Sequence, residues 1–244
     1  MSASSRFEVY GATDPGCVRT NNEDTYLIDQ SKGLYLLADG MGGARAGEHA
    51  SRLAVDTVDE RIRASNDATP ELLAASFEAA NEAVLTASTN DEALRGMGTT
   101  LVGVLECGDG LAVASVGDSR CYLFENGELK LISEDQTWAH EIGQHLGIDP
   151  VAMRSHPMRH VLTMAIGADP SLRIHNYRLQ PGVGAKILMS SDGLHGVIPA
   201  EKISETLNSG QSLEAQCHYL IDEARKAGGP DNITVVLLRK KAEI

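Results

Sequence analysis

Aromatic residues and positive charges are both scarce in this chain of 244 residues. Only 4% of the residues are Phe, Trp or Tyr, so a platform of aromatic rings that stacks nucleic-acid bases is not expected. The 21 Lys and Arg residues are outnumbered by 34 Asp and Glu residues, which leaves a net charge of −13. Because this charge repels polyanions and anionic membrane surfaces, we expect neither nucleic acid nor a membrane among the partners.

Cysteine pairs and long apolar runs are missing as well. The four cysteines are scattered without a C-x-x-C pair, which argues against a zinc knuckle and against a disulfide framework. No window of 18 apolar residues occurs, and the first twenty residues lack the apolar core of a signal peptide. The sequence therefore predicts a soluble, cytoplasmic protein with free thiols.

Short apolar runs of strand length recur along the chain, and 42% of its residues are hydrophobic, enough for a sizeable core. Turns that contain Gly or Asp separate many of these runs, which predicts antiparallel hairpins. The runs lie at 7–12, 25–28, 34–38, 99–107, 111–116, 120–124, 128–132, 172–179, 185–189 and 233–238.

Three longer segments have apolar residues at helical spacing: residues 46–64, a segment that opens at Thr69-Pro70, and a segment that follows Ser212. Runs of strands with helices grouped between them predict an α+β layered fold. Residues 133–170, which hold four of the eight histidines, do not fit this pattern. We expect them to leave the sheet layers and to form a lid or a recognition surface.

Acidic residues stand at the ends of several predicted strands. Asp39 and Asp118 close two of the runs, Asp192 follows a third, and Asp231 stands just before a fourth. In an antiparallel sheet the C-terminal end of one strand lies beside the N-terminal end of its neighbour, so these carboxylates can share one end of the sheets.

The hairpin formed by the runs at 25–28 and 34–38 adds further carboxylates to the same place. Its symmetry sets Asp24 opposite Asp39, with Glu23 one residue away. Five carboxylates in one place repel one another and need cations or raised pKa values to compensate. Oxygen ligands without matching Cys or His favour Mg²⁺, Mn²⁺ or Ca²⁺ over zinc.

Glycine and one arginine complete this candidate site. Asp39 is followed by Gly40-Met41-Gly42-Gly43, where the absence of side chains allows a backbone carbonyl to face a cation. Arg19 is suited to holding an oxyanion. An equally good interpretation is that Arg19 neutralises Glu23 or Asp24 at the surface.

Six short motifs occur in a fixed order along nearly the whole chain: Arg19-Thr20-Asn21-Asn22-Glu23-Asp24, Ala38-Asp39-Gly40-Met41-Gly42-Gly43, Gly96-Met97-Gly98-Thr99-Thr100, Gly117-Asp118-Ser119-Arg120, Ser190-Ser191-Asp192-Gly193-Leu194 and Gly229-Pro230-Asp231-Asn232-Ile233-Thr234. Together they resemble the motifs of the metal-dependent serine/threonine protein phosphatases, the protein phosphatase 2C type, in its compact bacterial form. The resemblance implies a single phosphatase domain over 1–244, folded as a four-layer αββα sandwich with a flap at about 133–170.

The resemblance also implies a role for each candidate residue. Asp39 would bridge two tightly bound Mn²⁺ or Mg²⁺ ions, with the Gly40 carbonyl on the second. Asp192 and Asp231 would complete the first ion's ligands, and Asp118 with Asp192 would hold a weaker third ion. Glu23 and Asp24 would act through waters on the metal. Arg19 would clamp the substrate phosphate and, like Asp39, would count as catalytic.

The proton donor for the leaving group is the point on which the chain departs from the family. Many relatives have histidine directly after the Asp-Gly pair or after Asp-Gly-Met-Gly-Gly, whereas this chain has Met41 and Ala44. His195 follows Asp192-Gly193-Leu194 and could be a donor, but a surface histidine is the favoured interpretation, and we expect water at the metal site to supply the proton. Ser119 has no histidine base beside it, so a turn role is expected for it.

The function implied is metal-dependent hydrolysis of phosphoserine and phosphothreonine in proteins by a metal-activated bridging water, opposing a serine/threonine kinase. Two alternatives belong to other classes of protein. One is a catalytically silent module that captures a phosphorylated partner, and the other is a structural calcium-binding domain. Retention of all ligand carboxylates argues against the first, and Arg19 near a structural cation argues against the second.

Overall fold

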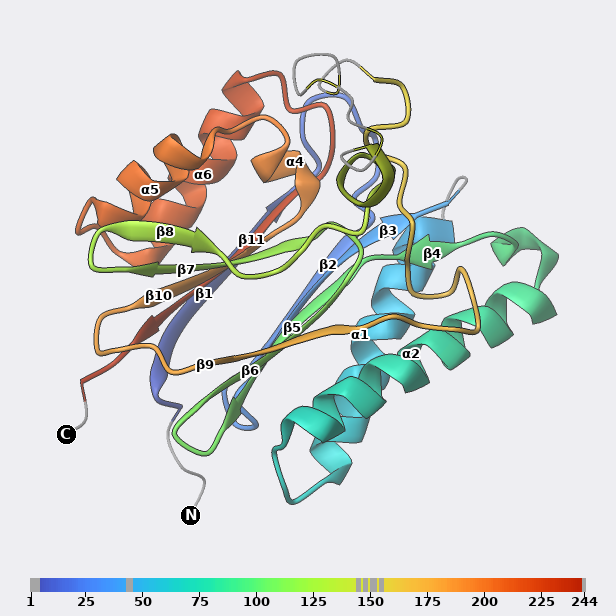
Figure 1. The fold of residues 1–244 in the computed structure, drawn as a ribbon, viewed down its shortest axis with the longest axis horizontal. Helices are drawn as coiled ribbons and strands as arrows, with labels where there is room; N and C mark the ends of the chain where they lie inside the picture. The colour runs from blue at the N-terminus through green and yellow to red at the C-terminus, as the bar shows by residue number, and fades with distance from the viewer. Residues whose placement is uncertain are drawn as a thin grey trace.

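The computed structural model describes residues 5–42, 46–143, 146, 149, 153 and 156–242. Two antiparallel β-sheets pack face to face (Figure 1). Sheet I has the order β1 (Phe7–Asp14), β11 (Ile233–Lys240), β10 (Lys186–Ser190), β7 (Arg120–Glu125) and β8 (Glu128–Leu131). Sheet II has the order β2 (Asp24–Asp29), β3 (Leu34–Met41), β5 (Leu101–Cys107), β6 (Gly110–Val116) and β9 (His175–Leu179), and the short strand β4 (Gly98–Thr99) pairs with β3.

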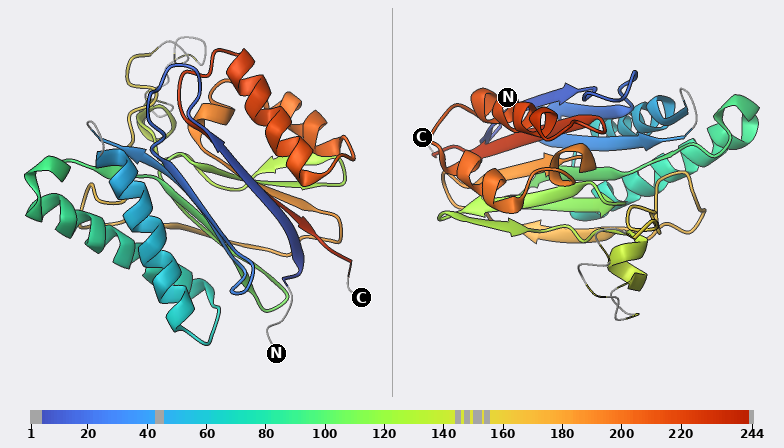
Figure 2. Two further views of the ribbon diagram at one scale, coloured as in Figure 1. Left: turned by 180° about the vertical axis from the view of Figure 1, so that it is seen from behind. Right: turned by 90° about the horizontal axis from the view of Figure 1, so that it is seen from above.

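Helices cover the outer face of each sheet, as both views in Figure 2 show. On sheet II lie α1 (Ala46–Ala64) and α2 (Pro70–Asn90), and on sheet I lie α5 (Ala200–Asn208) and α6 (Leu213–Lys226). Three shorter elements are η1 (Glu92–Leu94), the π-helical turn η2 (Ala139–Gly143) and α4 (Asp192–His195). The predicted four-layer αββα sandwich is therefore confirmed.

Strand β3 shows why these residues form a central strand. Successive side chains point to opposite faces, so Tyr35 and Leu37 enter the core between the sheets while Leu34, Leu36 and Ala38 pack under the helices. All five are fully buried. A continuous apolar run is therefore needed here, because neither face of the strand meets water.

The predicted elements are present, with shifts at their ends. The run at 99–107 divides into β4 and β5, and the run at 172–179 becomes a strand only from His175. The Thr69 hydroxyl accepts a hydrogen bond from the Leu72 N–H at 3.1 Å, and the Ser212 hydroxyl accepts one from the Ala215 N–H at 3.2 Å. Both residues thus cap the helices that they were expected to open.

Helices α4 and α5 were not predicted, because each is too short to show a clear helical period in the sequence. None of the helices in the described parts of the chain combines the length and the apolar character that crossing a bilayer requires.

The loop after β1, helix α4, the loop before β11 and the described part of 133–170 gather at the same end of the sandwich, the upper end in Figure 1. The segment 133–170 connects β8 to β9, and its central part lies largely outside the described residues. This end of the sheets is where the sequence places its carboxylates.

Candidate active site

A cavity of about 370 Å³ opens at this end of the sheets. It brings together every predicted site residue except Asp24, which lies beneath it. The residues that line it are Arg19, Glu23, Asp39, Gly40, Met41, Gly42, Thr100, Asp118, His160, Val161, Leu162, Asp192 and Asp231.

Asp24 and Asp39 are direct cross-strand partners in the β2–β3 hairpin, as the hairpin symmetry predicted. The Asp24 Oδ2 atom accepts hydrogen bonds from the Ser191 hydroxyl at 2.8 Å and the Thr234 hydroxyl at 2.6 Å. Asp24 therefore ties sheet II to the end of sheet I. Its other oxygen, Oδ1, is buried and has no partner among the described residues. Burial raises the pKa of Asp24 to about 7.

Asp39 is held by its backbone. Its N–H donates to the Thr100 hydroxyl at 2.9 Å, and its carbonyl accepts from the Thr100 N–H at 2.9 Å. The Thr100 hydroxyl is 2.7 Å from the buried Ser119 hydroxyl, so Ser119 braces the floor of the site. Burial and the neighbouring carboxylates, Asp24 first among them, raise the pKa of Asp39 well above its ordinary value.

The position of α1 explains the glycine that follows Asp39. A Cβ atom at Gly40 would collide with the backbone carbonyl of Gly47 in the first turn of α1. Only glycine allows the helix to start directly against the end of β3. The Gly40 N–H also donates to the Glu23 carbonyl at 3.1 Å, which draws Glu23 to the same place.

Asp118 and Asp192 approach the cavity from sheet I and its connections. Asp118 lies in the turn between β6 and β7, where burial and the charge of Asp192 raise its pKa to about 8. Asp192 is the first residue of α4, and a Cβ atom at Gly193 would collide with the Asn232 carbonyl. This close approach sets Asp192 beside Asp231, and burial, followed by the charge of Asp231, raises the pKa of Asp192.

Arg19 pairs with Asp231, at 2.8 Å between Nη2 and Oδ2. This partner is neither Glu23 nor Asp24, the two residues considered from the sequence. The side chains are 55% and 34% exposed, so the guanidinium can reach both solvent and the cavity. The hydrogen bond to Asp231 and the charge of that carboxylate raise the pKa of Arg19.

Asn232 is a residue that the sequence reasoning did not single out. Its Oδ1 atom accepts from the Glu23 N–H at 2.8 Å, and its Nδ2 atom donates to the carbonyls of Asn21 at 2.8 Å and Pro15 at 3.1 Å. The side chain thus fixes the loop that carries Arg19 and Glu23. Its place directly after Asp231 in the last motif was the available signal.

Histidine enters the cavity from an unexpected position. His160, with Val161 and Leu162, lines it from the segment 133–170, where only a general recognition role was expected. His195 is not among the lining residues. Its Nδ1 atom lies 2.9 Å from the Ser190 hydroxyl, and burial lowers its pKa well below the ordinary value. Of the two positions where relatives have histidine, Met41 lines the cavity and Ala44 lies outside the described residues.

The carboxylates line a common cavity without forming a ready-made coordination sphere. In the parts of the chain that the structure describes, no three His, Cys, Asp or Glu side chains converge as a metal-binding group. The engagement of Asp231 with Arg19 is one reason. The raised pKa values of Asp24, Asp39 and Asp118 show the repulsion and desolvation that a cation would relieve.

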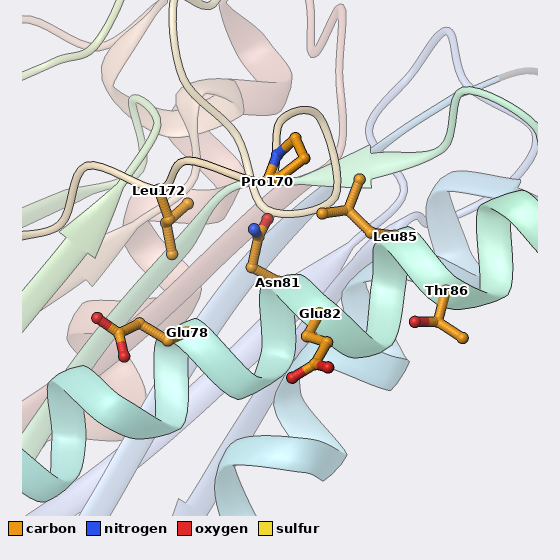
Figure 3. Close-up of a pocket in the computed structure, with 7 residues that line it drawn as sticks. All are labelled: Glu78, Asn81, Glu82, Leu85, Thr86, Pro170 and Leu172. Carbon is orange, nitrogen blue, oxygen red and sulfur yellow. The ribbon is translucent and has the colours of Figure 1, made fainter.

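A second cavity, of about 400 Å³, lies between α2 and the loop at 168–172 (Figure 3). Asn81 points toward that loop and braces it, because its amide donates to the Asp169 carbonyl at 2.9 Å and accepts from the Gly167 N–H at 2.7 Å. Glu82 points away from the loop, and among the described residues that line this cavity only Glu78 and Glu82 are charged. This cavity does not have the chemistry of the first.

Comparisons with known proteins agree with this geometry. A family model described as Protein phosphatase 2C matches residues 18–234. The serine/threonine phosphatase stp of Listeria monocytogenes serotype 4b (strain F2365) is 32% identical over 236 residues, covering 93% of this chain and 94% of that protein. The phosphatase PstP of Mycobacterium tuberculosis is 37% identical over 233 residues, which cover 92% of this chain and 43% of PstP.

A solved structure of the catalytic domain of PstP, in complex with two manganese ions, superimposes with a TM-score of 0.87 at 31% identity, covering 97% of this chain and 99% of that one. The resemblance found in six short motifs thus extends to the whole fold. The chain belongs to the protein phosphatase 2C family of serine/threonine phosphatases.

Proposed function

We propose that this protein removes phosphate from phosphoserine and phosphothreonine in phosphorylated proteins, with Mn²⁺ or Mg²⁺ held at the cavity end of the sandwich, and that it opposes a serine/threonine kinase. The observation that carries the proposal is the convergence of Arg19 and four aspartates from separate parts of the chain on one cavity. The proposal treats the chain as one phosphatase domain with 133–170 as its flap.

The donor set fits hard divalent cations. Four aspartates and the Gly40 backbone line the cavity and offer oxygen atoms, which Mg²⁺ and Mn²⁺ prefer. The buried Oδ1 atom of Asp24, which has no partner among the described residues, is an acceptor that water near a cation would satisfy.

Each lining residue has a proposed place at the metal site. Asp39 would bridge two tightly held ions with the Gly40 carbonyl on one of them, Asp192 and Asp231 would complete the first, and Asp118 with Asp192 would hold a weaker third. When bound, the ions would supply positive charge that activates a water and neutralises the phosphoryl group. Glu23 and Asp24 would orient waters next to these ligands.

Arg19 would bind the substrate phosphate. Its guanidinium lies at the cavity mouth with five donors, and its geometry matches two phosphate oxygens at once. Because Asp231 pairs with Arg19, recruitment of Asp231 to a metal would release Arg19 for the phosphate. Arg19 would then serve two partners in turn, Asp231 before a metal binds and the substrate phosphate afterwards.

The test is hydrolysis of a phosphothreonine peptide and a phosphotyrosine peptide, each with Mn²⁺ and with EDTA. We expect Mn²⁺-dependent release of phosphate from phosphothreonine, abolished in Asp39→Asn. Asp109→Asn, in an exposed turn at the opposite end of β6, is the matched control and should retain full activity. Binding of the phosphothreonine peptide without any hydrolysis would instead identify a silent phosphoprotein-binding module.

A further inference from the structure

His160 is the only imidazole among the described residues that line the cavity. The other titratable groups there are carboxylates and Arg19, whose guanidinium does not release its proton at neutral pH. We propose that His160 is the catalytic residue that protonates the leaving serine or threonine oxygen, a role that rests on the proposed phosphomonoester hydrolysis.

The chain on the C-terminal side of His160 is anchored by hydrogen bonds to the segment that follows β8. The Trp138 N–H donates to the Val161 carbonyl at 2.7 Å, and the Thr163 N–H donates to the Gln136 carbonyl at 2.9 Å. Leu162 and Thr137 form the β-bridge between these two bonds. The backbone next to His160 is therefore a short paired strand rather than a free loop.

Gln136 in turn connects this strand to the turn that bears Asp118. The Gln136 N–H donates to the Gly117 carbonyl at 3.0 Å, and the Gly117 N–H donates to the Gln136 Oε1 atom at 2.8 Å. Gln136 is fully buried. A continuous run of backbone hydrogen bonds thus sets the register of His160 relative to Asp118.

A second anchor holds the other end of the same segment. Ile166 and Thr99 exchange two backbone hydrogen bonds, at 2.9 and 3.0 Å, and Thr99 precedes Thr100, whose N–H donates to the Asp39 carbonyl at 2.9 Å. The chain that directly follows His160 is therefore attached to the floor of the site at two places, around Leu162 and at Ile166. This fixed base distinguishes His160 from a surface histidine that enters the cavity by chance.

His160 and Asp192 line the same cavity, so the ring and this carboxylate border the same space. His160 itself is exposed. An exposed ring can recover a proton from solvent after each turnover, which a buried histidine cannot do readily.

Two other histidines near this end of the fold, His195 and His156, have other contacts. His195 is bonded to Ser190 and is held neutral by burial. His156 stacks on Trp138, with ring centroids 4.5 Å apart and planes 8° apart, and does not line the cavity. Of these three histidines, only His160 lines the cavity.

In the proposed step, a water oxygen forms the new bond to phosphorus and gives one proton to solvent, while the bond from phosphorus to the threonine Oγ breaks with its electron pair remaining on Oγ. The imidazolium of His160 donates one proton to that oxygen and takes one back from solvent. An aryl phosphate leaves as a stable phenolate and hardly needs this proton, whereas a threonine alkoxide does.

The experiment compares His160→Gln with His156→Gln on two substrates, a phosphothreonine peptide and p-nitrophenyl phosphate. We expect His160→Gln to lower kcat on the peptide by about 10²-fold or more and kcat on the aryl phosphate by less than about threefold. His156→Gln should treat the two substrates alike. Equal losses on both substrates in His160→Gln, or no loss on the peptide, would overturn the assignment and leave water as the donor.

Two further measurements distinguish proton donation by His160 from metal ligation and from a structural role in the flap. Calorimetric titration should show unchanged Mn²⁺ binding in His160→Gln, and weaker binding would make the ring a metal ligand instead of a proton donor. Added imidazole should restore peptide hydrolysis in His160→Gly, with the emission of Trp138, the chain's single tryptophan, checking that the flap is folded. If the unaltered protein hydrolyses neither substrate, the proposed function fails, a result distinct from failure of the His160 assignment.

Discussion

Replacing Arg19 by alanine tests how the site divides one positive charge between Asp231 and the substrate. The Arg19–Asp231 pair is largely exposed, so its loss should cost only about 0.2–1 kcal/mol. A charge-assisted hydrogen bond to a phosphate is worth about 1.5–3 kcal/mol. We therefore expect KM for a phosphothreonine peptide to rise about 10- to 100-fold, with a smaller change in kcat, because the ground-state phosphate already carries the charge that Arg19 meets.

The same substitution should leave metal binding intact or improve it slightly. Without Arg19, the Asp231 carboxylate no longer has a competing partner, and the exposed pair limits the gain in Mn²⁺ affinity to less than about fivefold. Steady-state kinetics at saturating Mn²⁺ and calorimetric titration of the metal measure the two effects separately.

Arg225→Ala is the matched control for this experiment. Arg225 forms a similar pair at 2.8 Å with Asp14, the last residue before the loop that carries Arg19, but Arg225 does not line the cavity. Arg225→Ala should lower the melting temperature as much as Arg19→Ala does and leave KM unchanged. If Arg19→Ala behaves like this control, Arg19 is a structural cation and the phosphate-clamp reasoning is wrong.

Three further predictions concern the carboxylates. Replacing any one of the three proposed ligands by alanine, in Asp39→Ala, Asp192→Ala or Asp231→Ala, should lower turnover by about 10²-fold or more, since each loss takes charge from the transition state. Each substitution should also remove the thermal stabilisation by Mn²⁺. An unchanged rate in Asp192→Ala would exclude that residue as a ligand. Asp118→Ala should reduce activity while calorimetry still detects the tight metal pair, and loss of the tight sites would contradict its assignment to a weaker third ion. In EDTA, the free energy of unfolding should fall by on the order of 2 kcal/mol between pH 6.5 and pH 8.5. The folded-state pKa values are about 7 for Asp24 and about 8 for Asp118. The folded protein therefore holds protons in this interval that the unfolded chain has already released, and it loses them as the pH rises. Thermal melts at the two pH values measure this, and saturating Mn²⁺ should flatten the slope; a rise in stability over this interval would show that these carboxylates are not desolvated.

Much of the fold follows from local sequence pattern. Alternating or continuous apolar runs identify strands, because successive side chains of a strand point to opposite faces of the sheet. Thr69 and Ser212 mark the starts of helices, because their hydroxyls accept hydrogen bonds from N–H groups of the first turn. The hairpin connection also determined that Asp24 faces Asp39, since a short turn fixes the register of its two strands.

Other features of the site depend on contacts between segments far apart in the chain. The partner of Arg19 is Asp231, some 200 residues away, because the Asn232 side chain holds the loop at 15–23 against the start of β11. No local pattern near Arg19 contains this information, and the sequence pointed to the neighbouring Glu23 and Asp24 instead.

The place of His160 has the same origin. Its own neighbourhood contains weak helical signals and prolines, and nothing in that pattern directs a ring toward the carboxylates. The chain that follows His160 is held at the cavity by the hydrogen bonds of Gln136 with the β6–β7 turn and of Ile166 with β4. The sequence by itself determined which residue types meet at the end of the sheets, because strand ends are set locally. The tertiary structure decided which charges pair and which histidine enters the cavity, because those choices depend on hydrogen bonds between segments distant in the chain.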